Sequence, residues 1–211
     1  MKPRRVAILG GTFDPIHLGH LVAAQYAFHH LQADRLVLVP SASPVHRPRH
    51  RPADPKHRLR MCQLAALSLP PFTVSDAEVA RDEPSFTVIT LQRLAATFAP
   101  GTTLFLLVGE DNVPLLHTWK DYREILRLSS VVPMPRPLDR RADLRPLRDA
   151  IGPDAVDAIL ARRVPAPLVP LSSTDLRARI RSGASVAGLV PASVAAYIAA
   201  NGLYAATATG A

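Results

Sequence analysis

The chain has a single cysteine among its 211 residues, so an internal disulfide bond is excluded. Long apolar runs are missing from the N-terminus, where the first apolar stretch ends at Gly10. That stretch is too short for a membrane span or for the core of a signal peptide. These absences predict a cytoplasmic protein with no membrane partner. Cys62 lies in the helical pattern RLRMCQLAALSL, where we expect a plain core thiol.

Lysine is also scarce, since only three of the 25 basic residues are lysines and the others are arginines. With the many alanines and prolines, this indicates a compositional bias as much as selection for a polyanionic partner. The formal net charge of +8 permits nucleic-acid or nucleotide binding without demonstrating either.

Two common nucleotide-binding motifs are missing. The chain has no GxGxxG dinucleotide fingerprint and no GxxxxGK[ST] phosphate loop, so neither a dehydrogenase nor a P-loop kinase is supported. Any anion site in this chain must be of another kind.

What is present is enough apolar sequence for one sizeable domain, since 48% of the residues are hydrophobic. We expect this domain to span residues 1–204, followed by a frayed tail over 205–211. Strand-length apolar runs, most of them separated by helical patterns, occur at 6–9, 36–39, 72–74, 104–108, 130–132 and 168–171. This alternation predicts an α/β fold with a Rossmann-like, doubly wound parallel sheet, helices on both faces and a C-terminal helical segment. Two proline- and arginine-rich stretches, 40–55 and 133–146, are predicted to be surface loops.

The stretch GGTFDPIHLGH, residues 10–20, joins the first predicted strand to a predicted helix. In an open parallel sheet such a loop lies where helix N-termini present unpaired N–H groups to anions. Gly10 and Gly11 would let the backbone approach a ligand closely. His17 lies in the loop and His20 one turn later, so both imidazoles are expected to reach an anion docked there and to stabilise negative charge on phosphorus.

A second candidate is LSSTDLRARIRSG, residues 171–183, where Ser173 or Thr174 is predicted to cap a helix. The hydroxyls, the free N–H groups and Arg177 would form another phosphate cradle. Alone, the pattern fits an ordinary capped helix with a solvated arginine better. Together with the HxGH loop, it favours a phosphate site.

These two motifs resemble those of the HxGH nucleotidyltransferase superfamily, and in particular of the bacterial nicotinate-nucleotide adenylyltransferases. Further similar motifs follow in the same order from residue 6 to 204: PSASPVHRP, HRLRMCQLA, EPSFTVITL, LVGEDN, HTWKDY and LVPASVAAYIAANGLY. The resemblance implies transfer of AMP from ATP to nicotinate mononucleotide, giving deamido-NAD and pyrophosphate, with Mg²⁺ bound with ATP. It implies direct in-line attack on the α-phosphate. It also implies that no protein residues form a metal site and that no nucleic acid is a partner. The oligomeric state stays open.

The resemblance also implies roles for particular residues in ATP binding. His17 and His20 would contact the phosphates and stabilise the transition state. Asp111 would accept hydrogen bonds from the ribose, although a loop carboxylate that caps the next turn is an alternative. The implied ATP-site residues are Gly10, Gly11, Thr12, Phe13, Gly109, Asp111, Ser173, Thr174 and Arg177.

For the acceptor nucleotide, the resemblance implies that Trp119 stacks on the nicotinate ring, with backbone N–H groups near Thr87 and Lys120 binding its carboxylate. A core tryptophan is the alternative. Phe86 replaces the tyrosine of the family's PSYT motif, so any hydrogen bond from that hydroxyl is lost. The implied acceptor-site residues are His46, Arg47, Phe86, Thr87, Trp119, Lys120 and Arg136.

Two other acceptors and a nucleic-acid-binding function are alternatives. Nicotinamide mononucleotide or pantetheine phosphate are alternative acceptors, although Trp119 and the PSFT motif favour the nicotinate compound. An RNA-binding module or a class I aminoacyl-tRNA synthetase is suggested by the basic composition and the HIGH-like loop. A synthetase needs a KMSKS-like lysine loop and an RNA-binding extension, and this sequence has neither. A nucleic-acid binder would show steeply salt-dependent binding.

Overall fold

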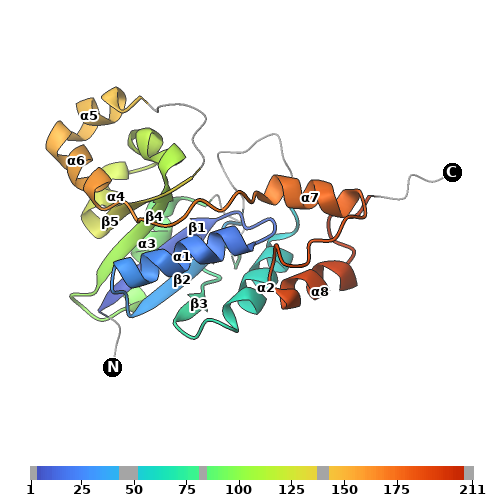
Figure 1. Cartoon of the computed structure of the whole chain (residues 1–211). Coiled ribbons are helices and arrows are strands. Elements are labelled where there is room, and N and C mark those ends of the chain that lie inside the picture. Colours follow the sequence, from blue (N-terminus) through green and yellow to red (C-terminus); the bar gives the residue numbers. More distant parts are fainter. Residues whose placement is uncertain (1–3, 43–51, 81–84, 137–142, 207–211) are drawn as a thin grey trace.

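The computed structural model describes residues 4–42, 52–80, 85–136 and 143–206, and it is built around one five-stranded sheet (Figure 1). All strand pairs are parallel and the strand order is β3-β2-β1-β4-β5. The strands are β1 (Arg5–Gly11), β2 (Arg35–Pro40), β3 (Phe72–Val74), β4 (Thr103–Gly109) and β5 (Ser130–Met134). Strands β2 and β3 lie on one side of β1, and β4 and β5 lie on the other.

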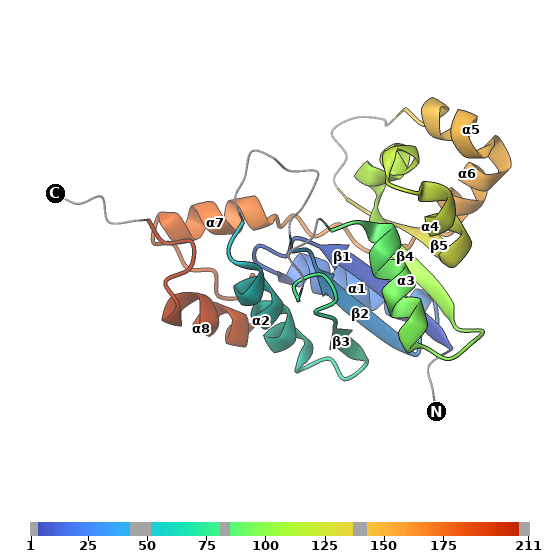
Figure 2. The same ribbon diagram turned by 180° about the vertical axis from the view of Figure 1, so that it is seen from behind.

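Helices cover both faces of the sheet. Figure 1 shows α1 across one face, and Figure 2, seen from behind, shows α3 across the other. The helices are α1 (Leu18–His30), α2 (Pro55–Ala66), α3 (Thr87–Thr97), the 3₁₀ helix η1 (Glu110–Thr118), α4 (Tyr122–Leu128), α5 (Arg145–Ile151), α6 (Pro153–Ala161), α7 (Ser173–Arg181) and α8 (Ala192–Ala200). None of the described helices combines the length and apolarity that a membrane crossing requires.

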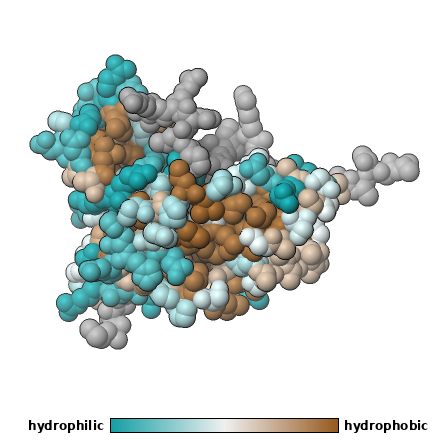
Figure 3. Space-filling view, viewed as in Figure 1, coloured by the Kyte–Doolittle hydropathy of each residue, from teal (hydrophilic) through white to brown (hydrophobic). Residues whose placement is uncertain are grey.

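Successive strand residues pack into different cores because side chains alternate across a strand. Ala7 faces the core that contains α1, α2, α7 and α8 residues, whereas Val6 and Ile8 face the core under α3 and α4. Figure 3 shows that apolar residues on the front face gather over α1 and the C-terminal helices. Because both faces of the sheet are buried, the strands appear in the sequence as nearly continuous apolar runs. The predicted Rossmann-like fold and C-terminal helical segment are confirmed.

The direction of winding reverses between β1 and β4. The chain passes from β1 outward to β3 on one side, then returns to β4 and continues to β5 on the other. The chain therefore leaves the carboxyl ends of these two adjacent strands toward opposite edges of the sheet. In open parallel sheets ligands bind at this reversal point.

The predicted strand at Leu168–Leu171 is wrong. The segment is extended but belongs to no strand among the described residues. Pro165, Pro167 and Pro170 explain this result, because proline has no N–H to donate to a strand ladder.

The two predicted loops are also shorter than expected. Pro40 ends β2, and α2 begins at Pro55, a position where a helix needs no N–H donor. Pro133 and Met134 lie in β5, an edge strand, where a missing donor is tolerated. Residues 43–51 and 137–142 lie outside the described part of the chain.

Cys62 is a free and fully buried thiol in α2. Burial raises its pKa well above the ordinary value, so the thiol stays protonated. The expectation of a plain core cysteine is confirmed.

Candidate active site

The loop between β1 and α1 ends in two histidines that cap the helix and each other. His17 is the N-cap residue of α1, and its Nδ1 accepts a hydrogen bond from the backbone N–H of His20 at 3.4 Å. In return, Nδ1 of His20 accepts from the backbone N–H of His17 at 3.3 Å. The two rings stack with their centroids 3.7 Å apart. This is a capping box made from imidazoles, and it fixes both rings at the start of the helix.

The capping geometry decides where the ring protons are. Because Nδ1 of each histidine accepts a hydrogen bond, the proton of a neutral ring is on Nε2. Burial, with a smaller effect from the charge of Arg136, lowers the pKa of His17 to about 4. His17 is therefore neutral at physiological pH and presents Nε2–H as a hydrogen-bond donor.

Small residues leave room for this arrangement. A Cβ on Gly19, between the two histidines, would lie 3.0 Å from Nδ1 of His17. A Cβ on Gly11 would lie 3.1 Å from the ring of Phe13, which is buried and contacts the His20 ring edge-on with a centroid distance of 5.2 Å. A Cβ on Gly10 would have no described heavy atom within 4 Å, so this position borders open space. The close approach of the His17 ring therefore explains why a glycine lies between the two histidines of the HLGH motif.

Helix α7 docks its N-terminus on the same loop. Ser172, and not the predicted Ser173 or Thr174, is the N-cap residue, and its Oγ accepts from the N–H of Asp175 at 3.1 Å. Ser173 instead donates its hydroxyl to the carbonyl of Pro15 at 3.0 Å.

Two other side chains of the predicted cradle differ in exposure. Thr174 is exposed, whereas Arg177 is only 8% exposed and donates from Nη1 to the carbonyl of Asp14 at 2.7 Å. The structure thus brings the SSTDLR motif into direct contact with Asp14 and Pro15, which precede the HxGH motif in the β1–α1 loop.

Asp111, predicted to bind the ribose, lies at the end of β4 beside Arg136, a residue predicted for the acceptor site. Asp111 lies in the first turn of η1, with Oδ2 3.5 Å from Nη1 of Arg136. A Cβ on Gly109 would lie 2.4 Å from Oδ1 of Asp111, so a larger residue here would displace the Asp111 side chain from this position. Both charged side chains are more than 40% exposed, which leaves this ion pair weak and accessible to a ligand.

Several predicted acceptor-site residues form another group around the start of α3. Phe86 is the N-cap residue and Thr87 the first helical residue, and no side chain caps this helix in the described structure. Nζ of Lys120 lies 4.6 Å from the centroid of the Phe86 ring. Ser85 accepts a hydrogen bond from the N–H of Ala42 at 3.0 Å, which ties the helix start to the loop after β2.

Trp119 follows η1 and is half-buried. It lines a hollow of about 750 Å³ together with Val88, His117 and Tyr122. Phe86, Thr87 and Lys120 are not among the described residues that line this hollow. The predicted His46 and Arg47 lie outside the described residues.

Sequence reasoning missed the role of Arg58, whose side chain is completely buried in α2. Its guanidinium donates to the carbonyls of Thr12 at 2.7 Å, Ser41 at 2.6 Å, Ala42 at 2.9 Å and Ala53 at 2.8 Å. One side chain thus joins the loops after β1 and β2 to the segment before α2. The helical spacing gave a signal, because Arg58 is in phase with the buried Met61, Cys62 and Ala65.

The chain is similar to known proteins over most of its length. The cytidylyltransferase-like family model matches residues 8–179. The chain belongs to the cytidylyltransferase-like family. A relative from Pseudomonas syringae pv. tomato named "Probable nicotinate-nucleotide adenylyltransferase" is 39% identical over 210 residues, which cover 96% of this chain and 94% of the relative. A relative of the same name from Roseiflexus castenholzii is 38% identical, with 97% and 100% covered. Within the cytidylyltransferase-like family, the chain is thus a member of the nicotinate-nucleotide adenylyltransferase group, which confirms the resemblance.

Solved structures share the fold of this cytidylyltransferase-like chain. The structure of a Plasmodium falciparum nicotinic acid mononucleotide adenylyltransferase complexed with NaAD has a TM-score of 0.68 at 17% identity. The match covers 95% of this chain and 97% of the Plasmodium chain. At this identity the comparison supports the Rossmann-like architecture.

Proposed function

We propose that this protein transfers AMP from ATP to nicotinate mononucleotide, giving deamido-NAD and pyrophosphate. The observation that carries the proposal is the His17–His20 capping box at the reversal point of the sheet. A phosphate oxygen of the mononucleotide forms a bond to the α-phosphorus of ATP. The bond from that phosphorus to the α–β bridging oxygen breaks, and pyrophosphate leaves with the electron pair.

The two histidines would act through hydrogen bonding and not as bases. In the neutral form each presents Nε2–H, which would donate to phosphate oxygens as negative charge develops on them. The open space at Gly10 would admit the nucleotide to the backbone. Positioning and charge stabilisation would supply most of the rate, as in phosphoryl transfer generally.

The other predicted ATP contacts divide between the ends of two elements. Asp111, exposed at the end of β4, would accept hydrogen bonds from the ribose. Ser173, Thr174 and Arg177 on α7 would hold the β- and γ-phosphates. Nε of Arg177 is buried and has no hydrogen-bond partner among the described residues, which supports a role for this side chain in anion binding.

The acceptor nucleotide would bind beside the start of α3. This N-terminus has no side-chain cap in the described structure, so its N–H groups would receive the carboxylate of the nicotinate ring. Lys120 would add a positive charge, and Trp119 would stack on the ring.

Magnesium enters the proposal as part of the MgATP substrate. Within the described residues, no group of three or more His, Cys, Asp or Glu side chains could hold a metal ion. In this proposal the triphosphate supplies oxygen ligands to Mg²⁺. The proposal also includes a cytoplasmic location and a single catalytic unit over residues 1–204, followed by a tail over 205–211. The family match over residues 8–179 supports the single unit.

The test is pyrophosphate release from MgATP with nicotinate mononucleotide, nicotinamide mononucleotide and pantetheine phosphate in parallel reactions. We expect strong preference for nicotinate mononucleotide. Equal use of both pyridine nucleotides would contradict the assigned acceptor but would still support adenylyl transfer. Preference for pantetheine phosphate would show that pantetheine phosphate, and not nicotinate mononucleotide, is the acceptor.

A further inference from the structure

The β1–α1 loop contains a carboxylate that does not face the open site. Asp14 is 2% exposed. Its Oδ1 accepts hydrogen bonds from the hydroxyl of Tyr204 at 2.8 Å and from the backbone N–H of Ala53 at 3.1 Å. Its Oδ2 lies 3.5 Å from Nη1 of Arg177. A buried carboxylate depends on such partners, because they replace the water that it has lost.

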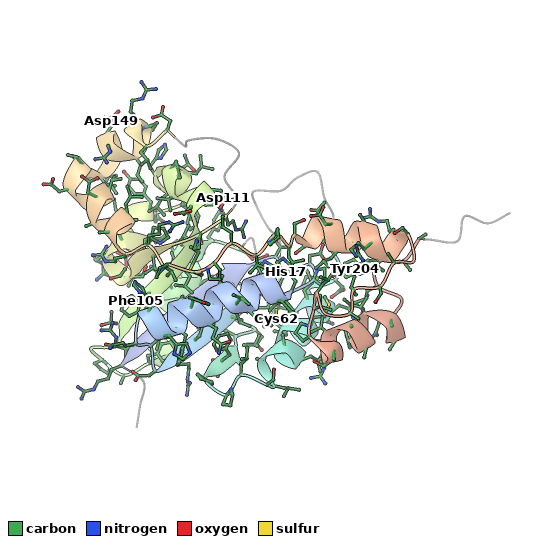
Figure 4. All side chains as sticks on the ribbon, in the orientation of Figure 1. His17, Cys62, Phe105, Asp111, Asp149 and Tyr204 are labelled. Carbon is green, nitrogen blue, oxygen red and sulfur yellow. The ribbon has the colours of Figure 1, made fainter. Side chains whose placement is uncertain are left out.

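These partners come from three segments that are distant in the sequence. Ala53 precedes α2, Arg177 belongs to α7, and Tyr204 follows α8. Figure 4 shows Tyr204 near α7 at the end of the sheet where His17 lies. Asp14 is therefore one of the residues through which the C-terminal segment is joined to the loop that carries the two histidines.

The backbone at Tyr204 is held in an unusual conformation. Its φ is +64°, in the left-handed region that bulky residues seldom adopt. Such a conformation persists only where the surroundings hold it in place. Burial, followed by the charge of Asp14, raises the pKa of the phenol far above its ordinary value, so the hydroxyl remains a donor.

The carboxylate is coupled to the candidate catalytic groups through its neighbour in the chain. Phe13 precedes Asp14, has a φ of +48° and lies edge-on to the ring of His20. A shift of Asp14 would therefore displace Phe13 and, through it, the imidazole that faces the phosphates.

We infer that Tyr204 is a positioning residue for the nucleoside triphosphate: by donating to Asp14 it fixes the β1–α1 loop in the conformation that binds the phosphates. The inference rests on the proposed function. It makes the segment that follows α8 part of the ATP site without any contact between this segment and the nucleotide.

The test compares Tyr204→Phe with Tyr197→Phe. Each variant loses one hydroxyl, and that of Tyr197 lies 2.8 Å from Nδ1 of His57, between α8 and α2 and away from the loop. We expect Tyr204→Phe to raise the KM for ATP by about tenfold, since small displacements of positioning groups are costly. The KM for nicotinate mononucleotide should change by less than about twofold, because its ring is proposed to bind beside the start of α3 and not on the β1–α1 loop. Tyr197→Phe should leave both constants near wild-type values.

Amide hydrogen exchange of residues 10–16 adds a readout that does not need activity. We expect faster exchange in Tyr204→Phe than in Tyr197→Phe, with both proteins folded. Equal KM values for ATP in the two variants, or a fall in kcat alone with unchanged loop exchange, would overturn the inference. An inactive wild-type enzyme with unequal loop exchange would instead count against the proposed function, so the two failures are distinguishable.

Discussion

At the scale of single residues, His20 has the clearest expected effect on the reaction. Its Nδ1 accepts the N–H of His17, so the proton of the neutral ring is on Nε2. We expect His20→Ala to lower kcat by about 10²–10³-fold, the usual cost of removing a transition-state donor. The rate of pyrophosphate release measures this fall in kcat. The control is His29→Ala, because His29 is an exposed histidine of the same helix. Near-normal turnover of a folded His20→Ala enzyme would refute the proposed role.

The pKa of His17 predicts how stability depends on pH. The folded chain has a pKa of about 4 at this site, whereas an unfolded chain has the ordinary value of 6.5. Between these values the unfolded state binds a proton that the folded state does not, so the free energy of unfolding falls as pH decreases. For this residue alone we expect a loss of about 2 kcal/mol between pH 7 and pH 5.

Urea denaturation at the two pH values measures this loss. The control is His17→Asn, because asparagine still caps a helix but does not titrate. The same pH dependence in the variant and the wild type would show that His17 is not responsible.

Lys120 predicts a difference between two acceptors. Its ammonium group lies over the Phe86 ring at the start of α3, where the nicotinate carboxylate is proposed to bind. We expect Lys120→Met to lower the preference for nicotinate over nicotinamide mononucleotide by about three- to fivefold, since exposed charge pairs are worth about 1 kcal/mol or less. The ratio of the two kcat/KM values measures it. Lys56→Met, on α2, is the matched control, and an unchanged ratio for Lys120→Met would remove the side chain from acceptor recognition.

At the scale of elements, Arg58 holds three connecting segments together. Four backbone carbonyls accept hydrogen bonds from its planar guanidinium, which an ammonium group cannot reproduce. We expect Arg58→Lys to lower the free energy of unfolding by about 3 kcal/mol or more, because buried acceptors lose their donors. Urea denaturation measures this change. Arg60→Lys, exposed on the same helix, should change stability by less than about 0.5 kcal/mol, and equal effects of the two substitutions would contradict the role of Arg58.

The regular elements were predictable where a local pattern decided them. The apolar runs at 6–9 and 104–108 predicted β1 and β4. The HxGH motif predicted His17 in the loop and His20 one turn later at the helix start, and the structure has His17 as the N-cap residue of α1. At Leu168–Leu171 the same kind of run misled, because the prolines beside it prevent pairing. The contact between Asp14 and Tyr204 joins residues 190 positions apart, and no local pattern reports such a pair.

At the scale of the whole molecule, the net charge of +8 permits nucleic-acid binding that is at most weak and nonspecific. We expect a 30-nucleotide RNA of random sequence to bind with a Kd of roughly 10⁻⁴–10⁻⁶ M, and salt to abolish the binding. Fluorescence anisotropy at increasing salt measures this. Tight binding that persists at high salt would favour the nucleic-acid module over the enzyme.

The two outer strands of the sheet bear on aggregation. An exposed strand edge offers unpaired N–H and C=O groups to another chain. At one edge β3 has only three residues. At the other edge β5 contains Pro133, which has no N–H, and its carbonyl already accepts a hydrogen bond from Val164 at 3.0 Å. Neither edge is a good template for strand addition from a second molecule, so the sheet that presents the active site is protected from extending into a fibre.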